Sequence, residues 1–196
     1  MTQAANPQAK LLTIEEYLAY DNDSDSRYEL EDGELVEMPP ESPENNRIAQ
    51  RLYVELLKHF AYYLIAHKDT EIEVSGKRAR CRLPDLMVHT EESFLALNGA
   101  ARATITRDMP PPALVIEVVS PGAINRARDY RYKCTEYAAR GISEYWIVDP
   151  EERQVTVCQW VDGAYEKTVV KADSPIPSVV IPAIGLNPNR IFANDR

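Results

Sequence analysis

The segment ALVIEVVS, residues 113–120, constrains the fold more than any other part of the sequence. Consecutive side chains of a β-strand point to opposite faces of a sheet, and here both sets are aliphatic. Such a strand lies in the middle of a sheet that is covered on both faces, as in parallel and mixed sheets. Glu117 interrupts the apolar run. Because an unpaired buried carboxylate costs several kcal/mol, we expect an arginine or lysine, hydrogen-bond donors or a metal ion beside it.

Helix-like and strand-like segments occur on both sides of this strand. Apolar residues at helical spacing predict helices at residues 12–20, 47–66 and 125–141. Strand patterns lie within residues 27–38, 71–89, 143–149, 154–161 and 164–170. Asp32-Gly33 predicts a two-residue type I′ turn in the first of these. The order predicts an α/β protein in which helices cover a mixed β-sheet, with a helix and a hairpin at the N-terminus.

Length, charge and cysteine content limit the class of protein. The 196 residues suggest one domain, and no apolar run approaches the roughly 20 residues of a membrane span. The net charge of −9 argues against binding nucleic acid through overall charge alone, whereas a local basic strip remains compatible with it. Three cysteines without CxxC spacing and no signal-peptide pattern predict a cytoplasmic protein without membrane contact. Residues 1–11 are polar, and we expect them to be flexible.

A second acid, Asp85, has surroundings similar to those of Glu117, because it lies in the apolar segment LPDLMV. Pro84 disfavours a regular ladder, so we expect the strand to bend and to direct Asp85 outward. Two carboxylates from neighbouring strands suit Mg²⁺ or Mn²⁺ better than zinc. The alternatives are an ordinary turn at Pro84-Asp85 and a structural ion pair of Glu117 with an arginine or a lysine.

Lys133 is the third candidate, on the helix predicted at residues 125–141. It lies three residues after Tyr130 and four before Tyr137, so it borders the apolar face of that helix. It also follows Asp129 by four residues, which allows a helical ion pair. A lysine beside two carboxylates can position an attacking water or stabilise charge on a phosphate. The alternative is a surface lysine that reaches solvent beside Asp129.

The densest basic patch of the chain directly precedes Asp85. It consists of Lys77, Arg78, Arg80 and Arg82. Because the patch leads into the segment that carries Asp85, we predict that it contacts the phosphates of a nucleic acid beside the metal site. The alternative is an exposed hairpin without such a role.

These motifs together resemble one known family. The segment EVVSP, followed by Asp129, Lys133 and Tyr137 and then by GISEYWIVD, is similar to the Uma-type domain of bacteria, long classed as a domain of unknown function. The resemblance extends over residues 12–192. It implies one restriction-endonuclease-like domain of the PD-(D/E)xK nuclease superfamily. Within the superfamily motif, Asp85 matches the first acid and Glu117 the second.

The resemblance also implies roles for individual residues. Val119 stands at the usual lysine position of the superfamily, and Lys133 matches the lysine that this family places on the following helix. Glu29 matches an acid in the first hairpin, and Ser120 matches the serine after the central strand. The family commonly has a histidine at the start of the long helix, where this chain has Asn45.

The resulting hypothesis is a metal-dependent endonuclease that hydrolyses phosphodiester bonds in nucleic acid, with DNA as the expected substrate. Asp85 and Glu117 would bind Mg²⁺ or Mn²⁺, with the carbonyl of Val118 as a further ligand. Lys133 would position or activate the water, and Glu29 would bind a second ion or orient the lysine. A homodimer is expected, because nucleases of this superfamily often cleave two strands as pairs.

One alternative is a nuclease-like fold that acts as a binding or assembly module without turnover. The acidic composition, Val119 and Asn45 favour this alternative. A hydrolase with a serine or cysteine nucleophile has little support, since no GxSxG motif occurs in the chain.

Overall fold

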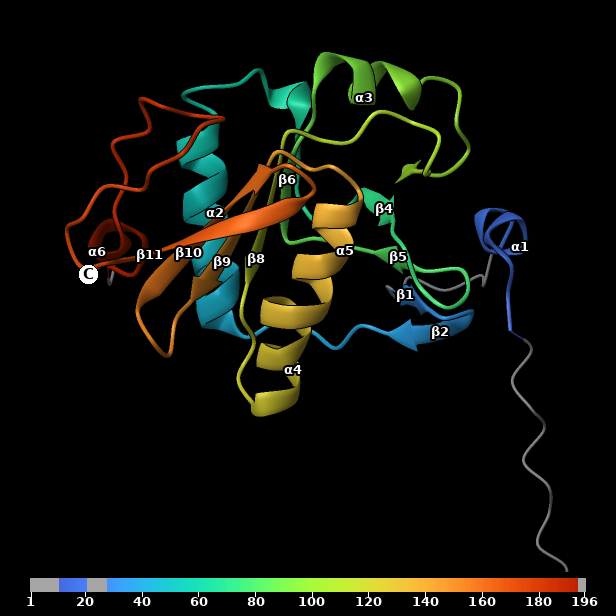
Figure 1. Ribbon diagram of the computed structural model, residues 1–196, viewed down its shortest axis with the longest axis horizontal. Coiled ribbons are helices and arrows are strands. Elements are labelled where there is room, and N and C mark those ends of the chain that lie inside the picture. The colour runs from blue at the N-terminus through green and yellow to red at the C-terminus, as the bar shows by residue number, and fades with distance from the viewer. Residues whose placement is uncertain (1–10, 21–27, 194–196) are drawn as a thin grey trace, which may run out of the picture.

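The computed structural model describes residues 11–20 and 28–193 of the chain. The segment expected to be flexible, residues 1–11, lies outside this part except for Leu11. Two β-sheets form the framework, and the helices are arranged around them (Figure 1). The predicted α/β class is confirmed. Within the described residues, no helix has both the length and the apolar character of a membrane span.

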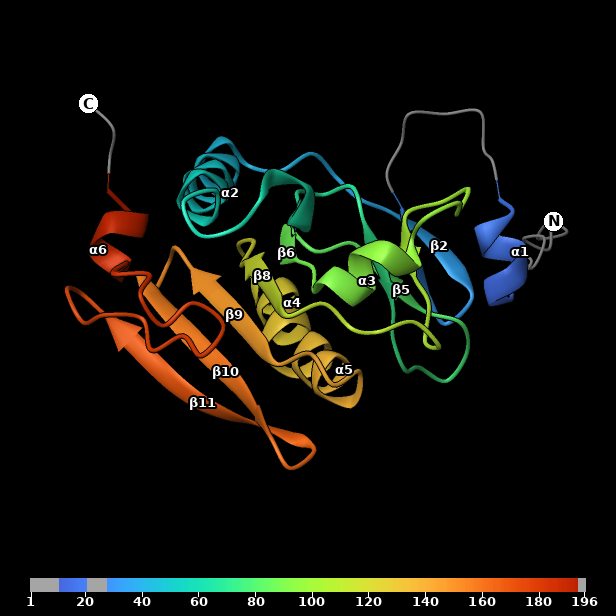
Figure 2. The same ribbon diagram turned by 90° about the horizontal axis from the view of Figure 1, so that it is seen from above.

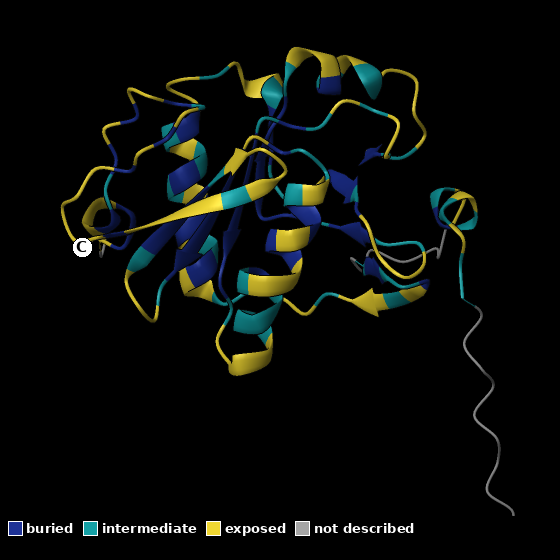
Figure 3. Cartoon of the chain, viewed as in Figure 1, coloured by how far each residue is buried: buried dark blue, intermediate teal, exposed yellow. Residues whose placement is uncertain are grey.

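The larger sheet has six strands in the order β11-β10-β9-β8-β6-β3. Its central strand β8 (Leu114–Val118) coincides with the apolar segment, and all of its residues are buried. β8 pairs in parallel with β9 (Glu144–Asp149) and antiparallel with β6 (Leu86–Val88), so the sheet is mixed as predicted. Figure 3 shows the buried centre of the sheet and the exposed edge strand β11. The other strands are β3 (Ile65–Ala66), β10 (Gln154–Val161) and β11 (Ala164–Lys171).

The two faces of β8 pack against different helices, because side chains alternate along a strand. Its even-numbered residues join a core that includes α2 (Pro43–Leu56). Val115 and the following Val119 join a second core that includes α5 (Cys134–Ala139). The two helices lie on opposite sides of the strands (Figure 2). Glu117 has the parity of the second set, so its side chain faces α5.

The smaller sheet, in the order β2-β1-β5-β4-β7, carries the N-terminal elements. The φ angles of Asp32 and Gly33 are 50° and 92°, which confirms the predicted type I′ turn between β1 and β2. Tyr17 of α1 (Ile14–Leu18) is buried against Leu30 and Cys81 of this sheet. Its strands are β1 (Tyr28–Glu31), β2 (Glu34–Glu37), β4 (Glu71–Glu73), β5 (Cys81–Arg82) and β7 (Thr104–Ile105).

The long helix predicted at residues 47–66 is wrong in its extent. α2 begins earlier, because the hydroxyl of Ser42 caps it and Pro43 suits the first helical position. It ends at Leu56, and residues 65–66 form β3 instead. The apolar spacing continues past the end of the helix, but pairing of β3 with β6 overrides this local pattern.

The helix predicted at residues 125–141 is confirmed as one continuous helical segment. It consists of α4 (Ala123–Ala127), a π-helical turn (Arg128–Lys133) and α5. The remaining short elements are a 3₁₀ turn (Tyr62–Leu64), α3 (Glu91–Ala96) and α6 (Pro188–Ile191).

One buried carboxylate attaches the C-terminal segment to the larger sheet. Glu144, the first residue of β9, is fully buried. It accepts hydrogen bonds from Trp146 Nε1 at 2.6 Å, Ser178 Oγ at 2.6 Å and the backbone nitrogen of Val179 at 2.7 Å. Its removal would leave buried donors unsatisfied in both the sheet and the C-terminal segment.

We predict that Glu144→Ala lowers the free energy of unfolding by about 3 kcal/mol, because two buried donors and one partly buried donor lose a charged acceptor. Urea denaturation of the two chains measures the difference. The matched control is Glu166→Ala on the exposed strand β11, which should change stability by no more than about 0.5 kcal/mol. Equal effects of the two substitutions would contradict the anchoring role of Glu144.

Candidate active site

Glu117 and Lys133 form the centre of a buried polar cluster between β8 and α5. Lys133 Nζ lies 2.8 Å from Glu117 Oε1. Only 2% of the surface of Lys133 and 4% of that of Glu117 are exposed. Tyr137, one turn further along the helix, donates a hydrogen bond from its hydroxyl to the same Oε1 at 2.8 Å. The buried carboxylate therefore has both a cation and a neutral donor.

A π-helical turn brings the lysine into this cluster. In an ordinary α-helix, steps of four residues drift by about 40° around the axis. The wider turn at Arg128–Lys133 offsets this drift, so Asp129, Lys133 and Tyr137 are all buried on one face. Lys133 Nζ lies 3.6 Å from Asp129 Oδ1, so the predicted helical ion pair is present inside the protein and not at its surface.

Asp85 approaches Glu117 from the neighbouring strand. β6 pairs with β8 in a register that, continued by one residue, places Asp85 opposite Glu117. Asp85 Oδ2 accepts a hydrogen bond from the backbone nitrogen of Val118 at 2.6 Å. The structure thus places both acids at the same end of β8, where Lys133 also lies. Ser120, two residues beyond β8, is half-buried.

Burial and charge act in opposite directions on the ionisation of Glu117. The pKa of Glu117 is raised to about 8: burial is the largest cause, Lys133 acts to lower the pKa, and the charges of Asp85 and Asp129 act to raise it. The positive charge of Lys133 is therefore not sufficient to return the pKa of Glu117 to its ordinary value. For Lys133 itself, burial lowers the pKa, but the three surrounding acids outweigh it and hold this pKa above its ordinary value. Burial and the charge of Glu117 raise the pKa of Tyr137, so its hydroxyl remains a donor.

Glu29 of β1 reaches the cluster from the smaller sheet. It is buried, and its Oε1 lies 3.8 Å from Lys133 Nζ. It also accepts hydrogen bonds from Arg82 Nη1 at 2.8 Å and from the backbone nitrogen of Leu83 at 3.2 Å. Burial opposes ionisation, but Lys133 and Arg82 hold the pKa of Glu29 below its ordinary value. Glu29 is therefore a buried, ionised partner of the lysine.

The residues of the predicted basic strip differ in burial: Arg82 is buried and Arg80 half-buried, whereas Lys77 and Arg78 are exposed. Arg82 is 2% exposed and forms ion pairs with Glu29, Glu31 and Glu136. A phosphate contact by Arg82 does not fit this position, because three carboxylates already surround the buried guanidinium. Arg80, whose side chain is 18% exposed, pairs with Asp32 and Glu136.

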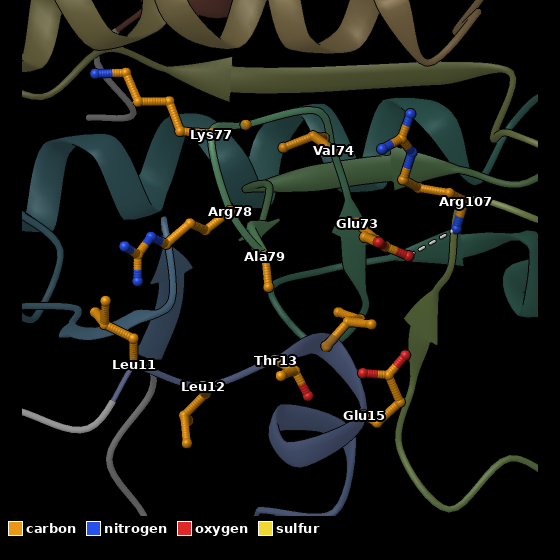
Figure 4. Close-up of a pocket in the computed structure, with 12 residues that line it drawn as sticks. Leu11, Leu12, Thr13, Glu15, Glu73, Val74, Lys77, Arg78, Ala79 and Arg107 are labelled. Atoms are coloured by element: carbon orange, nitrogen blue, oxygen red, sulfur yellow. Dashed lines mark hydrogen bonds between the residues drawn. The ribbon is translucent and has the colours of Figure 1, made fainter.

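Lys77 and Arg78 are the exposed part of the strip. They lie in the connection between β4 and β5 and line a cleft of about 590 Å³, whose wall also includes Arg107 and the segment around Thr13 (Figure 4). This cleft is lined by neither Asp85 nor Glu117. The two side chains are free to contact a polyanion at some distance from the acids.

Three further residues line the site: Lys68, Glu41 and Asn45. Of these, only Asn45 stands at a position that the family resemblance indicated. Lys68 Nζ lies 3.0 Å from Asp85 Oδ1 and 3.6 Å from Glu41 Oε1. Asn45, the family's histidine position, is buried and donates to the carbonyl of Val119 at 3.3 Å. Lys68 was not predicted because it follows the two-residue strand β3, whose residues continue the helical spacing of α2 in the sequence. Glu41 was not predicted because it lies in a loop without a recognisable pattern.

The carboxylates of the site suit a metal ion that takes only part of its ligands from the protein. Among residues 11–20 and 28–193, no three His, Cys, Asp or Glu side chains are placed to hold an ion together. Asp85 and Glu117 remain as a pair, and the donors that contact Glu117 in this part of the chain both bind Oε1. Mg²⁺ is often held by one or two carboxylates, while water and substrate phosphates complete its octahedron. The pair fits that mode and not a closed zinc site.

Comparison with models of known protein families identifies the family of this chain. A family model named Uma2, described as "Putative restriction endonuclease", matches residues 14–189. The chain belongs to the Uma2 family. No curated protein matches the chain.

Comparison with solved structures gives a match for the fold of the chain. The chain is similar to a crystal structure from Anabaena variabilis ATCC 29413 that is described as a "putative nuclease belonging to DUF820". The TM-score is 0.62 at 16% identity, over 93% of this chain and 98% of the other. At this identity the likeness shows the fold alone, and it confirms the fold that the sequence resemblance implied for a Uma2 protein.

The raised pKa of Glu117 predicts a pH-dependent stability. Between its ordinary pKa of 4.5 and about 8, the folded chain holds a proton that the unfolded chain has lost, so stability falls as pH rises through this window. We expect wild type to lose stability relative to Glu117→Gln by up to about 1.4 kcal/mol per pH unit between about pH 5 and 8. Urea denaturation across this range measures the difference. Parallel pH profiles for the two chains would contradict the assignment.

Proposed function

We propose that this Uma2 protein is a metal-dependent endonuclease that hydrolyses phosphodiester bonds in DNA. The observation that carries the proposal is the joining of Asp85, Glu117 and Lys133 in one cluster at the end of β8. Two carboxylates from adjoining strands and a lysine from the next helix match the motif of the PD-(D/E)xK superfamily. The family description, restriction endonuclease, is consistent with this chemistry.

Asp85 and Glu117 would hold Mg²⁺ or Mn²⁺, with the carbonyl of Val118 as a further ligand. When bound, such an ion supplies Lewis acidity at the phosphate and lowers the pKa of a coordinated water. Lys133 holds the attacking water in line with the phosphate and stabilises the negative charge that develops there. Tyr137 fixes the orientation of Glu117 through its hydrogen bond to Oε1.

The surrounding acids position the lysine. Glu29 and Asp129 lie 3.8 Å and 3.6 Å from Lys133 Nζ and keep it protonated. A protonated lysine does not act as a general base, so its task is to orient water and to stabilise charge. Asn45 connects α2 to the end of β8, and Ser120, half-buried two residues beyond β8, would contact the substrate.

Local charge, and not overall charge, would attract the DNA. The chain has a net charge of −9, so affinity must come from the bound cation and a few exposed cations. Lys77 and Arg78 are the exposed members of the basic strip and would contact phosphates that flank the cleavage site. Cleavage of both strands would use a homodimer, and the three free cysteines suit the reducing cytoplasm.

A second candidate function is a binding or assembly module without turnover. The observation that favours it is the ion pairing of both acids: each already has a lysine within 3.0 Å. In that case the cluster would only stabilise the fold. The two functions differ in whether the wild-type chain cleaves DNA when a divalent cation is present.

We predict that Lys133→Ala reduces Mg²⁺-dependent cleavage of DNA at least about 100-fold, because the water and the phosphate lose their cationic partner. Nicking of supercoiled plasmid measures the rate, and circular dichroism verifies the fold. The matched control is Lys171→Ala, which removes an exposed lysine and should leave the rate unchanged. Equal cleavage by wild type and Lys133→Ala would reject the assignment. A folded wild type that binds DNA without cleaving it would favour the second function.

A further inference from the structure

Lys68 lies at the proposed metal site, although nothing in the superfamily motif accounts for it. Its Nζ is 3.0 Å from Asp85 Oδ1, the oxygen on the opposite side of the carboxylate from the hydrogen bond of Val118. The position follows from sheet pairing. β3 pairs antiparallel with β6, and continuing their register by two residues places Lys68 opposite Asp85. Cross-strand neighbours of this kind have adjacent side chains.

The backbone of Lys68 is also unusual. Its φ angle is 55°, in the left-handed region that residues with a side chain rarely adopt. Such conformations persist where the surroundings hold them, and they are frequent at functional sites. The side chain of Lys68 forms ion pairs with Asp85 and Glu41.

The two lysines of the site differ in their freedom to move. Lys133 is held by three acids, and 2% of its side chain is exposed. Lys68 is held by two acids, and its side chain is 12% exposed. Its second partner, Glu41, has a side chain that is 25% exposed. Lys68 therefore lies at the mouth of the site, where its flexible stem can carry the ammonium toward solvent.

We propose that Lys68 is an exchangeable counter-ion of the site: it neutralises Asp85 when no divalent cation is bound, and it binds a phosphate of the substrate once the cation takes its place. The inference rests on the proposed nuclease function. A divalent cation and the ammonium compete for the same oxygen of Asp85. When the ammonium is displaced, Glu41 keeps it at the mouth, beside the place where a phosphate would meet the cation.

This exchange couples metal binding to substrate binding. Without the cation, Lys68 is paired with Asp85 and attracts DNA weakly. With the cation bound, its charge becomes available to the substrate. The chain would then retain DNA in its metal-loaded state, which compensates in part for its unfavourable net charge.

Calorimetric titration of the full chain with Mn²⁺ tests the competition. We expect Lys68→Met to bind Mn²⁺ about tenfold more tightly than wild type, because a competing unit charge is removed from a partly screened site. Lys68→Arg, which keeps the charge, should remain close to wild type. The matched control is Lys58→Met, which removes a lysine paired with Glu55 on the surface of the protein, and should not change the affinity.

The outcomes separate the inference from the function on which it rests. Absence of Mn²⁺ binding in both wild type and Lys68→Met contradicts the proposed nuclease function. Binding in wild type that is not tightened in Lys68→Met contradicts the counter-ion role alone. If Lys68→Met does not fold, the Cε resonance of Lys68 in the wild-type chain, assigned with Lys68→Arg, decides the question. It should shift on addition of Mg²⁺ while that of Lys58 does not, and an unchanged Lys68 resonance overturns the proposal.

Binding of DNA tests the second half of the exchange. Lys133→Ala serves as a background in which cleavage is expected to be at least about 100-fold slower. In Mg²⁺, adding Lys68→Met should reduce the slope of log affinity against log salt concentration by about one, the loss of one phosphate contact. Without Mg²⁺ the slope should not change, because Lys68 is then paired with Asp85. An equal slope with and without Lys68 in Mg²⁺ would overturn the phosphate contact.

Discussion

The burial of a carboxylate in the middle of the central strand is the constraint on which the rest of the site depends. β8 must be apolar on both faces to lie between α2 and α5, yet it places the carboxyl group of Glu117 on its α5 face. Lys133 and Tyr137, both from the helical segment that follows the strand, give the buried carboxyl group a cation and a hydrogen-bond donor. The π-helical turn, the ion pair with Asp129 and the approach of Glu29 all serve to hold that lysine.

Some basic side chains of the chain stabilise the fold through ion pairs, and others remain exposed to a ligand. Arg80 and Arg82 are bound by carboxylates that connect the smaller sheet to α5, so they hold the two halves of the site together. Lys133 is fixed inside the site, and Lys68 lies at its mouth. Lys77 and Arg78 remain exposed in the β4–β5 connection. An acidic Uma2 protein can therefore present positive charge to a phosphate backbone only where a cation is exposed or released.

The features that the sequence predicted are those set by local rules. A run that is apolar on both faces located β8, and the Asp32-Gly33 pair specified the turn between β1 and β2. The family spacing joined Asp85, Glu117 and Lys133. Pairing between distant segments was not predictable in the same way. β3 follows residues that continue the helical spacing of α2, so its pairing, and with it the position of Lys68, was hidden. The charges of Arg80 and Arg82 indicated an exposed strip, because sequence does not distinguish a solvated cation from one paired in a buried network.

Diffraction from crystals soaked in Mn²⁺ tests the central claim most directly, since the anomalous signal of manganese locates the ion without reference to activity. We predict one peak between the carboxylates of Asp85 and Glu117, with Lys133 still at Glu117 and Lys68 turned away from Asp85. An empty site with both lysines in place at saturating Mn²⁺ would contradict it, and the cluster would then be a structural ion-pair network in a protein of nuclease fold.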